Sequence, residues 1–153
     1  VASNLRYGKA DASDEEMWNA LAIAQAESFV RDMPGSLEAT IAQGGSNVSG
    51  GQRQRLAIAR VLIRKPAIYI FDDSFSALDL VTDASLRTAL IPHIASSVTV
   101  IVGQRISTIR HANQIMVLED GQIVGLGTHE QLSQSCATYQ EIVASQATQE
   151  GDD

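Results

Sequence analysis

Residues 47–79, with the sequence NVSGGQRQRLAIARVLIRKPAIYIFDDSFSALD, decide the fold, because they divide into a turn, a helix and a strand. Ser49 can cap a helix that begins in the glycine turn, and Gln52 completes a capping box. Apolar residues at helical spacing predict that this helix runs over residues 50–63. It ends ahead of Pro66, because the residue before a proline is pushed out of the α region.

A strand follows this helix and ends in two carboxylates. The short apolar run at residues 67–71 contains two β-branched isoleucines and is bounded by chain breakers, which predicts a buried strand. Asp72 and Asp73 stand where that strand ends. Open α/β sheets bind ligands outside the carboxyl ends of their strands, so this pair of carboxylates marks a candidate binding site.

In this order and spacing, three segments resemble the motifs of the ATP-binding cassette (ABC) ATPases. VSGGQ at residues 48–52 is similar to the signature motif, which is normally LSGGQ. IYIFD at residues 68–72 is similar to Walker B, and SALD at residues 76–79 is similar to the D-loop. Two further segments resemble those of the family's exporters, namely the X-loop at residues 38–44 and the ending at residues 127–132.

The resemblance implies an α/β fold, in which the C-terminal part of a RecA-like P-loop ATPase core is joined to a helical subdomain. That core has a mostly parallel sheet with flanking helices and a C-terminal β-hairpin. Residues 1–65 are expected to form the helical subdomain, with the X-loop and the signature helix. Residues 66–147 are expected to form the C-terminal part of the core, and residues 148–153 an acidic, disordered tail. The dipeptide Asp120-Gly121 independently predicts a type I′ hairpin turn.

The resemblance also implies ATP and Mg²⁺ as cofactors, and it assigns site residues by position. Asp72 matches the Walker B carboxylate that holds the Mg²⁺ shell, and oxygen ligands suit this cation. Asp73 and Gln104 stand at the catalytic positions after Walker B and in the H-loop. The nucleotide-contact positions are Val48, Ser49, Gly50, Gly51, Gln52, Ser76 and Asp79. In the family, the signature loop closes over the ATP bound to the opposite subunit.

Two positions depart from the family's pattern and indicate a degenerate nucleotide site. The residue after the Walker B Asp is usually Glu, the general base for water, and here it is the shorter Asp73. The H-loop usually holds His, whereas Gln104 can donate a hydrogen bond but cannot relay a proton. The signature is nearly intact, with Val48 in place of Leu. The chain is therefore expected to complete the active site of a different subunit in a heterodimer, and a homodimer with two slow sites is the alternative.

Composition narrows the range of partners. The formal net charge of −7 argues against a nucleic-acid-binding surface. No apolar run reaches the length of about 18 residues that a membrane span needs. The exporter resemblance implies contact with transmembrane domains and a place at the cytoplasmic face of the cell membrane. The lone Cys136 allows no internal disulfide, and the histidines lack the spacing of zinc ligands.

The sequence contains no G-x-x-x-x-G-K-[ST], so the Walker A loop and the Q-loop are expected to precede Val1 in a longer protein. ATPase activity is therefore expected of the full-length protein, and this chain alone is expected to be inactive. Two other interpretations remain open. One is a soluble ABC ATPase of the DNA-repair or translation type, and the other is a non-catalytic assembly fragment that only donates a signature surface.

Overall fold

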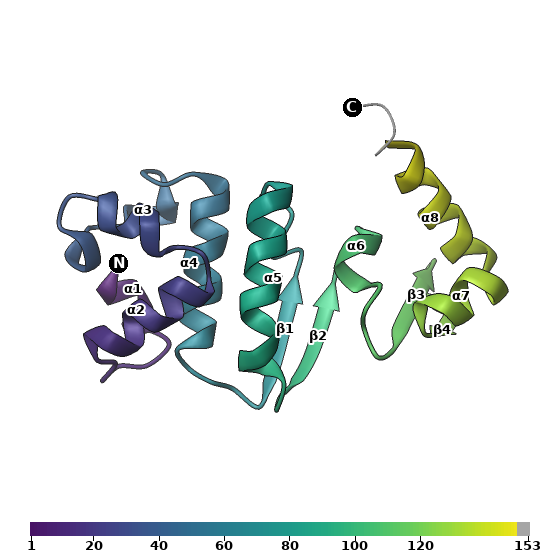
Figure 1. The fold of residues 1–153 in the computed structure, drawn as a ribbon, viewed down its shortest axis with the longest axis horizontal. Coiled ribbons are helices and arrows are strands. Elements are labelled where there is room, and N and C mark those ends of the chain that lie inside the picture. The colour runs from purple at the N-terminus through teal and green to yellow at the C-terminus, as the bar shows by residue number, and fades with distance from the viewer. Residues whose placement is uncertain (150–153) are drawn as a thin grey trace. The chain divides into compact units, whose positions relative to one another are not determined.

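The computed structural model describes residues 1–149 (Figure 1), and these form two compact units that divide after Val100. The boundary after residue 65 that the sequence suggests concerns subdomains, and it stays a prediction. Of the tail expected at residues 148–153, residues 150–153 lie outside the described part of the chain. Residues 148 and 149 end the last helix.

Unit 1, residues 1–100, is built mainly from helices. Its α-helices are α1 (Ala2–Arg6), α2 (Asp14–Ile23), α3 (Glu27–Asp32), α4 (Gly50–Leu62) and α5 (Leu80–Ile94). Two short 3₁₀ helices lie between α3 and α4, namely η1 (Ser36–Glu38) and η2 (Gln43–Gly45). Strand β1 (Ile68–Asp72) is hydrogen-bonded to β2 (Val98–Val102), which begins in this unit, and the two run parallel with α5 connecting them (Figure 1).

Helix α2 begins at a capping box. The Ser13 hydroxyl accepts a hydrogen bond from the Glu16 amide at 3.2 Å, and the Glu16 carboxylate accepts one from the Ser13 amide at 3.0 Å. The helix packs against α4, and its side chains Met17 and Leu21 are fully buried. A capped first turn and a buried apolar stripe together explain why this segment is helical.

Helix α4 and strand β1 lie within one residue of the positions that the sequence predicts. The Ser49–Gln52 capping box opens α4, as predicted. The chain has left the right-handed helical region by Lys65, whose φ is +49°, so α4 ends before Pro66.

The expectation that β1 is a buried strand holds for only one of its two faces. Tyr69 and Phe71 are buried, whereas Ile68 is 57% exposed and Ile70 is 68% exposed. Tyr69 lines a small cavity together with side chains of α2, α4 and α5, so these helices cover its face of the strand. Because alternate side chains of a strand point to opposite faces, Ile68 and Ile70 lie on the other face.

Strand β2 repeats this alternation beside β1. The Val98 amide donates a hydrogen bond to the Ala67 carbonyl oxygen at 3.0 Å, which sets the two strands side by side. Within unit 1 the exposed face of this strand pair is apolar. We call it the open sheet face, and it consists of Ile68, Ile70, Val98 and Val100.

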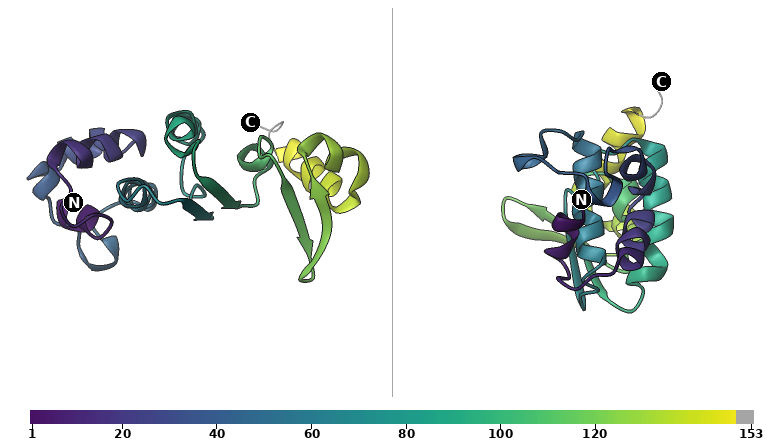
Figure 2. Two further views of the ribbon diagram at one scale, coloured as in Figure 1. Left: turned by 90° about the horizontal axis from the view of Figure 1, so that it is seen from below. Right: turned by 90° about the vertical axis from the view of Figure 1, so that its left-hand side faces the viewer.

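Unit 2, residues 101–149 of the described chain, is a β-hairpin packed against short helices. Its elements after β2 are α6 (Ile106–Ile109), β3 (Ile115–Glu119), β4 (Gln122–Gly127), α7 (His129–Ser135) and α8 (Ala137–Gln149). Strands β3 and β4 pair antiparallel as a hairpin (Figure 2). Their register is irregular between Val117 and Leu118. Asp120 and Gly121 have φ values of +48° and +76°, as a type I′ turn requires, so the predicted hairpin turn is confirmed.

The two faces of the hairpin differ in exposure. One face supports the core of unit 2, a buried cluster of Ile115, Val117, Leu132, Cys136 and Tyr139. The other is an apolar exposed face, the open hairpin face, formed by Met116, Leu118, Ile123 and Leu126. Parallel strands flanked by helices, followed by an antiparallel hairpin, confirm the predicted α/β fold class. Among the described residues, no helix is long and apolar enough to cross a lipid bilayer.

Replacing Gly8 by Ala is expected to destabilise unit 1 strongly. A Cβ atom there would lie 2.2 Å from the Arg60 carbonyl oxygen and 2.8 Å from a methyl carbon of Ile63, so α4 would have to move away. Overpacking of this kind costs about 1–3 kcal/mol and sometimes more. Urea unfolding of the purified chain measures the loss. Gly50→Ala is the control, because its Cβ would only make an ordinary contact with Ala77; equal losses in both variants would contradict the steric explanation.

Candidate nucleotide-contact site

The VSGGQ segment, residues 48–52, forms the N-terminus of α4, and we call it the signature turn. The Ser49 hydroxyl accepts a hydrogen bond from the Gln52 amide at 3.2 Å, and the Gln52 side-chain oxygen accepts one from the Ser49 amide at 2.9 Å. The amides of Gly50 and Gly51 lie in the first helical turn, where no carbonyl of the helix can accept from them. Amides of this kind, at the positive end of a helix dipole, suit an anion such as a phosphate.

The glycines of this turn also pack closely against the D-loop. A Cβ atom at Gly51 would lie 2.9 Å from the Ala77 carbonyl oxygen, whereas one at Gly50 would lie 3.6 Å from the Ala77 methyl. Only glycine therefore fits at position 51 without a shift, and a larger residue fits at position 50. Gly51, predicted as a nucleotide contact, is thus also required by this neighbour within the same chain.

Gln54 joins the signature helix to the segment after Walker B. Its side-chain nitrogen donates to the Asp73 carbonyl oxygen at 3.3 Å and to the Ser76 hydroxyl at 3.2 Å. Its side-chain oxygen accepts from the Ala77 amide at 3.0 Å. Sequence reasoning missed this residue, because its partners lie 19 to 23 positions away and no local pattern indicates them.

The two carboxylates predicted at the end of β1 are both exposed. Asp72 is the last residue of the strand, and Asp73 follows it with φ of +47°, a left-handed conformation that Asp adopts more readily than most residues. The Ser74 hydroxyl donates to the Asp72 carbonyl at 3.3 Å, and the Ser76 hydroxyl donates to the Asp73 carbonyl at 3.0 Å. These bonds fix the backbone and leave the carboxylate of Asp72 facing solvent.

No cage of protein ligands surrounds Asp72. Over the part of the chain that the structure describes, no three His, Cys, Asp or Glu side chains are grouped to hold a metal ion. A single exposed carboxylate fits Mg²⁺, which usually keeps several waters and takes one or two carboxylates together with phosphate oxygens. It does not fit an ion that needs a complete set of protein ligands.

Asp79, predicted as a nucleotide contact, caps helix α5. Its carboxylate accepts a hydrogen bond from the Thr82 amide at 2.9 Å, and this bond holds the pKa of the Asp79 carboxyl below its usual value. The carboxylate in turn partly offsets the desolvation that lowers the pKa of Arg55. Arg55 donates to the Gln25 carbonyl oxygen at 2.6 Å and lies 5.0 Å from the centre of the Phe29 ring.

Gln104 belongs to unit 2, in the short connection between β2 and α6. Its side chain is exposed. Its carbonyl oxygen accepts a hydrogen bond from the side chain of Gln146 at 2.6 Å. The other predicted site residues all belong to unit 1, where the signature turn, the D-loop and the end of β1 are joined by Gln54.

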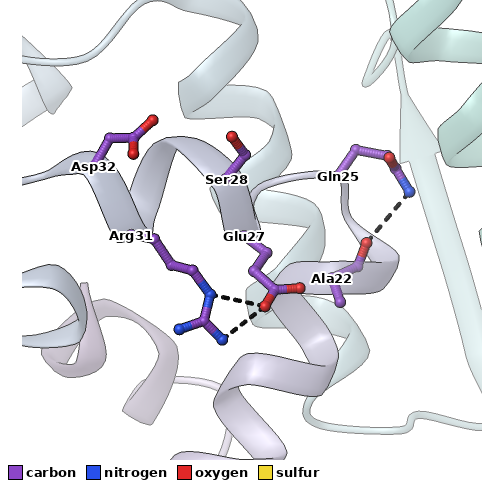
Figure 3. A pocket seen from close by; sticks show the side chains of 6 residues that line it. All are labelled: Ala22, Gln25, Glu27, Ser28, Arg31 and Asp32. Atoms are coloured by element: carbon purple, nitrogen blue, oxygen red, sulfur yellow. Dashed lines mark hydrogen bonds and ion pairs between the residues drawn. The ribbon is translucent and has the colours of Figure 1, made fainter.

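The described residues also form a hollow elsewhere in unit 1. A surface pocket of about 480 Å³ is lined by Ala22, Gln25, Glu27, Ser28, Arg31 and Asp32 (Figure 3). Arg31 and Glu27 form an ion pair of 2.7 Å across one turn of α3. None of the predicted site residues lines this pocket, so the candidate site is a surface of loops and helix ends.

Comparison with known proteins agrees with these motifs. The family model described as "ABC transporter" matches residues 3–76. An ABC transporter ATP-binding protein of Mycobacterium tuberculosis is 51% identical over 150 residues, which are 96% of this chain and 25% of the relative. An ABC transporter ATP-binding protein of Bacillus subtilis is 42% identical over 151 residues, which are 99% of this chain and 26% of the relative.

A solved structure shares the fold of nearly the whole chain. It is that of a bacterial Atm1-family ABC exporter with ATP bound, and it matches with a TM-score of 0.90 and 32% sequence identity. The match covers 95% of this chain and 26% of the exporter chain. The chain thus spans about a quarter of the length of the proteins that it matches.

Proposed function

The chain belongs to the ABC transporter family of ATP-binding proteins, and from this premise we propose that it is part of the ATP-hydrolysing subunit of a membrane exporter. That subunit would couple the binding and hydrolysis of ATP to substrate transport, in contact with transmembrane domains and at the cytoplasmic face of the cell membrane. The similarity to an exporter along 95% of the chain supports this over a soluble ATPase. The net charge of −7 further disfavours a DNA-repair role.

The signature turn is the observation that carries the proposal. Gly50 and Gly51 present amides at the N-terminus of a capped helix, and Ser49 adds a hydroxyl. In the proposed subunit these donors cradle the γ-phosphate of an ATP that a partner subunit holds. Val48 and Gln52 support the turn, the first from a half-buried position and the second through the capping box.

The end of β1 would serve the nucleotide of this subunit itself. When bound, Mg²⁺ would neutralise charge on the phosphate oxygens during their transfer. Asp72 would hold the water shell of that ion, and Asp73 would orient the attacking water from a carboxylate one methylene shorter than the usual Glu. Gln104 would donate a hydrogen bond to a phosphate oxygen, and Ser76 and Asp79 would contact the nucleotide.

We infer that this second site is slow and that the chain acts in a heterodimer. The short Asp73 and the uncharged Gln104 weaken catalysis at the subunit's own Walker B, while the signature turn keeps its full set of donors. A heterodimer lets that turn complete the active site of a competent partner. A homodimer would place Asp73 and Gln104 in both sites.

Isothermal titration with Mg-ATP tests the proposal. We expect the full-length protein to bind the nucleotide and the purified chain to show no sub-millimolar binding. The physical reason is that the 153 residues contain no G-x-x-x-x-G-K-[ST] loop, which supplies a lysine and most of the phosphate-facing amides. Sub-millimolar binding of Mg-ATP by the chain alone would contradict this expectation. A full-length protein that binds no ATP would refute the ATPase proposal and favour an assembly role.

A further inference from the structure

Helix α6 begins without a cap of its own. It comprises four residues, Ile106–Ile109, and the side chain of its N-cap residue Arg105 makes no capping hydrogen bond. The Ile106 amide, in the first turn, has no carbonyl within so short a helix to donate to. The acceptor comes from 40 residues further along the chain, because the side-chain oxygen of Gln146 in α8 lies 2.8 Å from the Ile106 nitrogen.

The side chain of Gln146 also binds the backbone of Gln104, the residue before the N-cap residue Arg105. The side-chain nitrogen of Gln146 donates to the Gln104 carbonyl oxygen at 2.6 Å. A primary amide combines a donor and an acceptor on one planar group, so Gln146 can hold a carbonyl and an amide two residues apart at once. A carboxylate offers only acceptors at neutral pH, and an aliphatic side chain offers neither.

Helix α8 is anchored well enough to act as a support for this contact. Tyr139 is 1% exposed and belongs to the core of unit 2, and Val143 packs against that core. Tyr139, Val143 and Gln146 are spaced four and three residues apart, which places them on one face of the helix. Ile106 and Ile109 of α6 pack against the same core. Helix α8, which carries Gln146, and helix α6, whose first amide Gln146 binds, thus pack on the same apolar cluster.

We propose that Gln146 is a positioning residue, which fixes the backbone of the segment 104–106 and thereby sets the direction in which the exposed Gln104 side chain points. The anchoring itself rests only on the geometry of unit 2. Its bearing on ATP hydrolysis rests on the proposed function, in which Gln104 contacts a phosphate. Helix α8 would then influence the nucleotide site through a single side chain.

Amide hydrogen exchange in the purified chain tests the anchoring without reference to ATP. Gln146→Ala is expected to speed exchange at the Ile106 amide roughly three- to tenfold, the effect of losing about one net hydrogen bond. Gln140→Ala is the matched control, because Gln140 lies on the same helix and donates to the Ser133 carbonyl oxygen at 2.9 Å. Should Gln146→Ala not fold, Gln146→Glu keeps the length and the acceptor. It should leave Ile106 protected and free the Gln104 carbonyl, which a shifted Gln104 ¹³C carbonyl resonance would report.

Hydrolysis at this subunit's own site, measured in the full-length complex with the partner's site disabled, then tests the positioning role. Gln146→Ala should lower kcat and leave the KM for ATP nearly unchanged, and it should have no further effect in a Gln104→Ala background. Unchanged exchange at Ile106, or an undisturbed Gln104 carbonyl in Gln146→Glu, would overturn the anchoring. Additive losses of kcat in the double variant would overturn positioning through Gln104. A full-length protein without ATPase activity would refute the proposed function, and the exchange result would still decide the anchoring.

Discussion

Replacing Gly50 by Asp is expected to reduce ATP hydrolysis by the full-length complex ~10²–10³-fold, the usual effect of losing a donor aimed at developing charge. The new carboxylate would stand among the amides of the first turn of α4 and repel the γ-phosphate held by the partner. The change leaves room for the side chain, because a Cβ at this position would lie 3.6 Å from the Ala77 methyl. An acidic residue in the first turn is also compatible with the helix dipole. The loss should therefore be one of turnover and not of folding.

Three comparisons give that measurement its meaning. Gly50→Ala adds the same Cβ without charge and should retain most of the activity. Ser49→Ala removes a hydroxyl donor and should also lower the rate, but it removes the N-cap as well, at about 0.5–2 kcal/mol of stability. Asp73→Asn should matter much less in a heterodimer, because the competent site uses the carboxylate of the partner. A full rate in Gly50→Asp would contradict the role of the signature turn, and loss of all hydrolysis in Asp73→Asn would contradict the heterodimer.

Restoring both departures from the family pattern should raise turnover at this subunit's own site. We expect Asp73→Glu combined with Gln104→His to increase single-site hydrolysis on the order of a hundredfold, because a misplacement of about 1 Å can cost that factor. The measurement needs a complex whose other site is disabled. Each single change serves as a control and should give only part of the gain.

In the double variant, Asp73→Glu places a longer side chain on a backbone in the left-handed conformation. Asp73 has φ of +47°, and a longer side chain in this left-handed region carries a cost of roughly 1–2 kcal/mol. The thermal stability of the double variant should therefore be recorded beside its activity. If the complex is stable and its single-site rate is unaltered, degeneracy does not explain the two substitutions.

Local signals in the sequence predicted the local structure well. Ser49 with Gln52 marked the start of α4, Pro66 marked its end, and Asp120-Gly121 marked the hairpin turn. Each of these depends on a few neighbouring residues, whose hydrogen bonds and backbone angles are set nearby. The pattern of apolar residues likewise located β1.

What the sequence did not predict depends on distant contacts. The exposure of Ile68 and Ile70 depends on which faces of the strand other segments cover, and a run of apolar residues carries no such information. Gln54 and Gln146 bind backbone groups 19 to 42 residues away, and only the fold brings them there. The family motifs assigned positions to the site residues, and the contacts of Gln54 were needed to connect them.

The open sheet face and the open hairpin face also determine how the chain behaves in solution. Each presents a row of apolar side chains that favours association between molecules, while the net charge of −7 opposes it through mutual repulsion. Salt weakens only the repulsion, since the screening length falls to about 10 Å at 0.1 M ionic strength and about 3 Å at 1 M. Ionic strength therefore sets the colloidal stability of the chain. Buffers of low ionic strength, at a pH above the isoelectric point, disfavour association of its molecules.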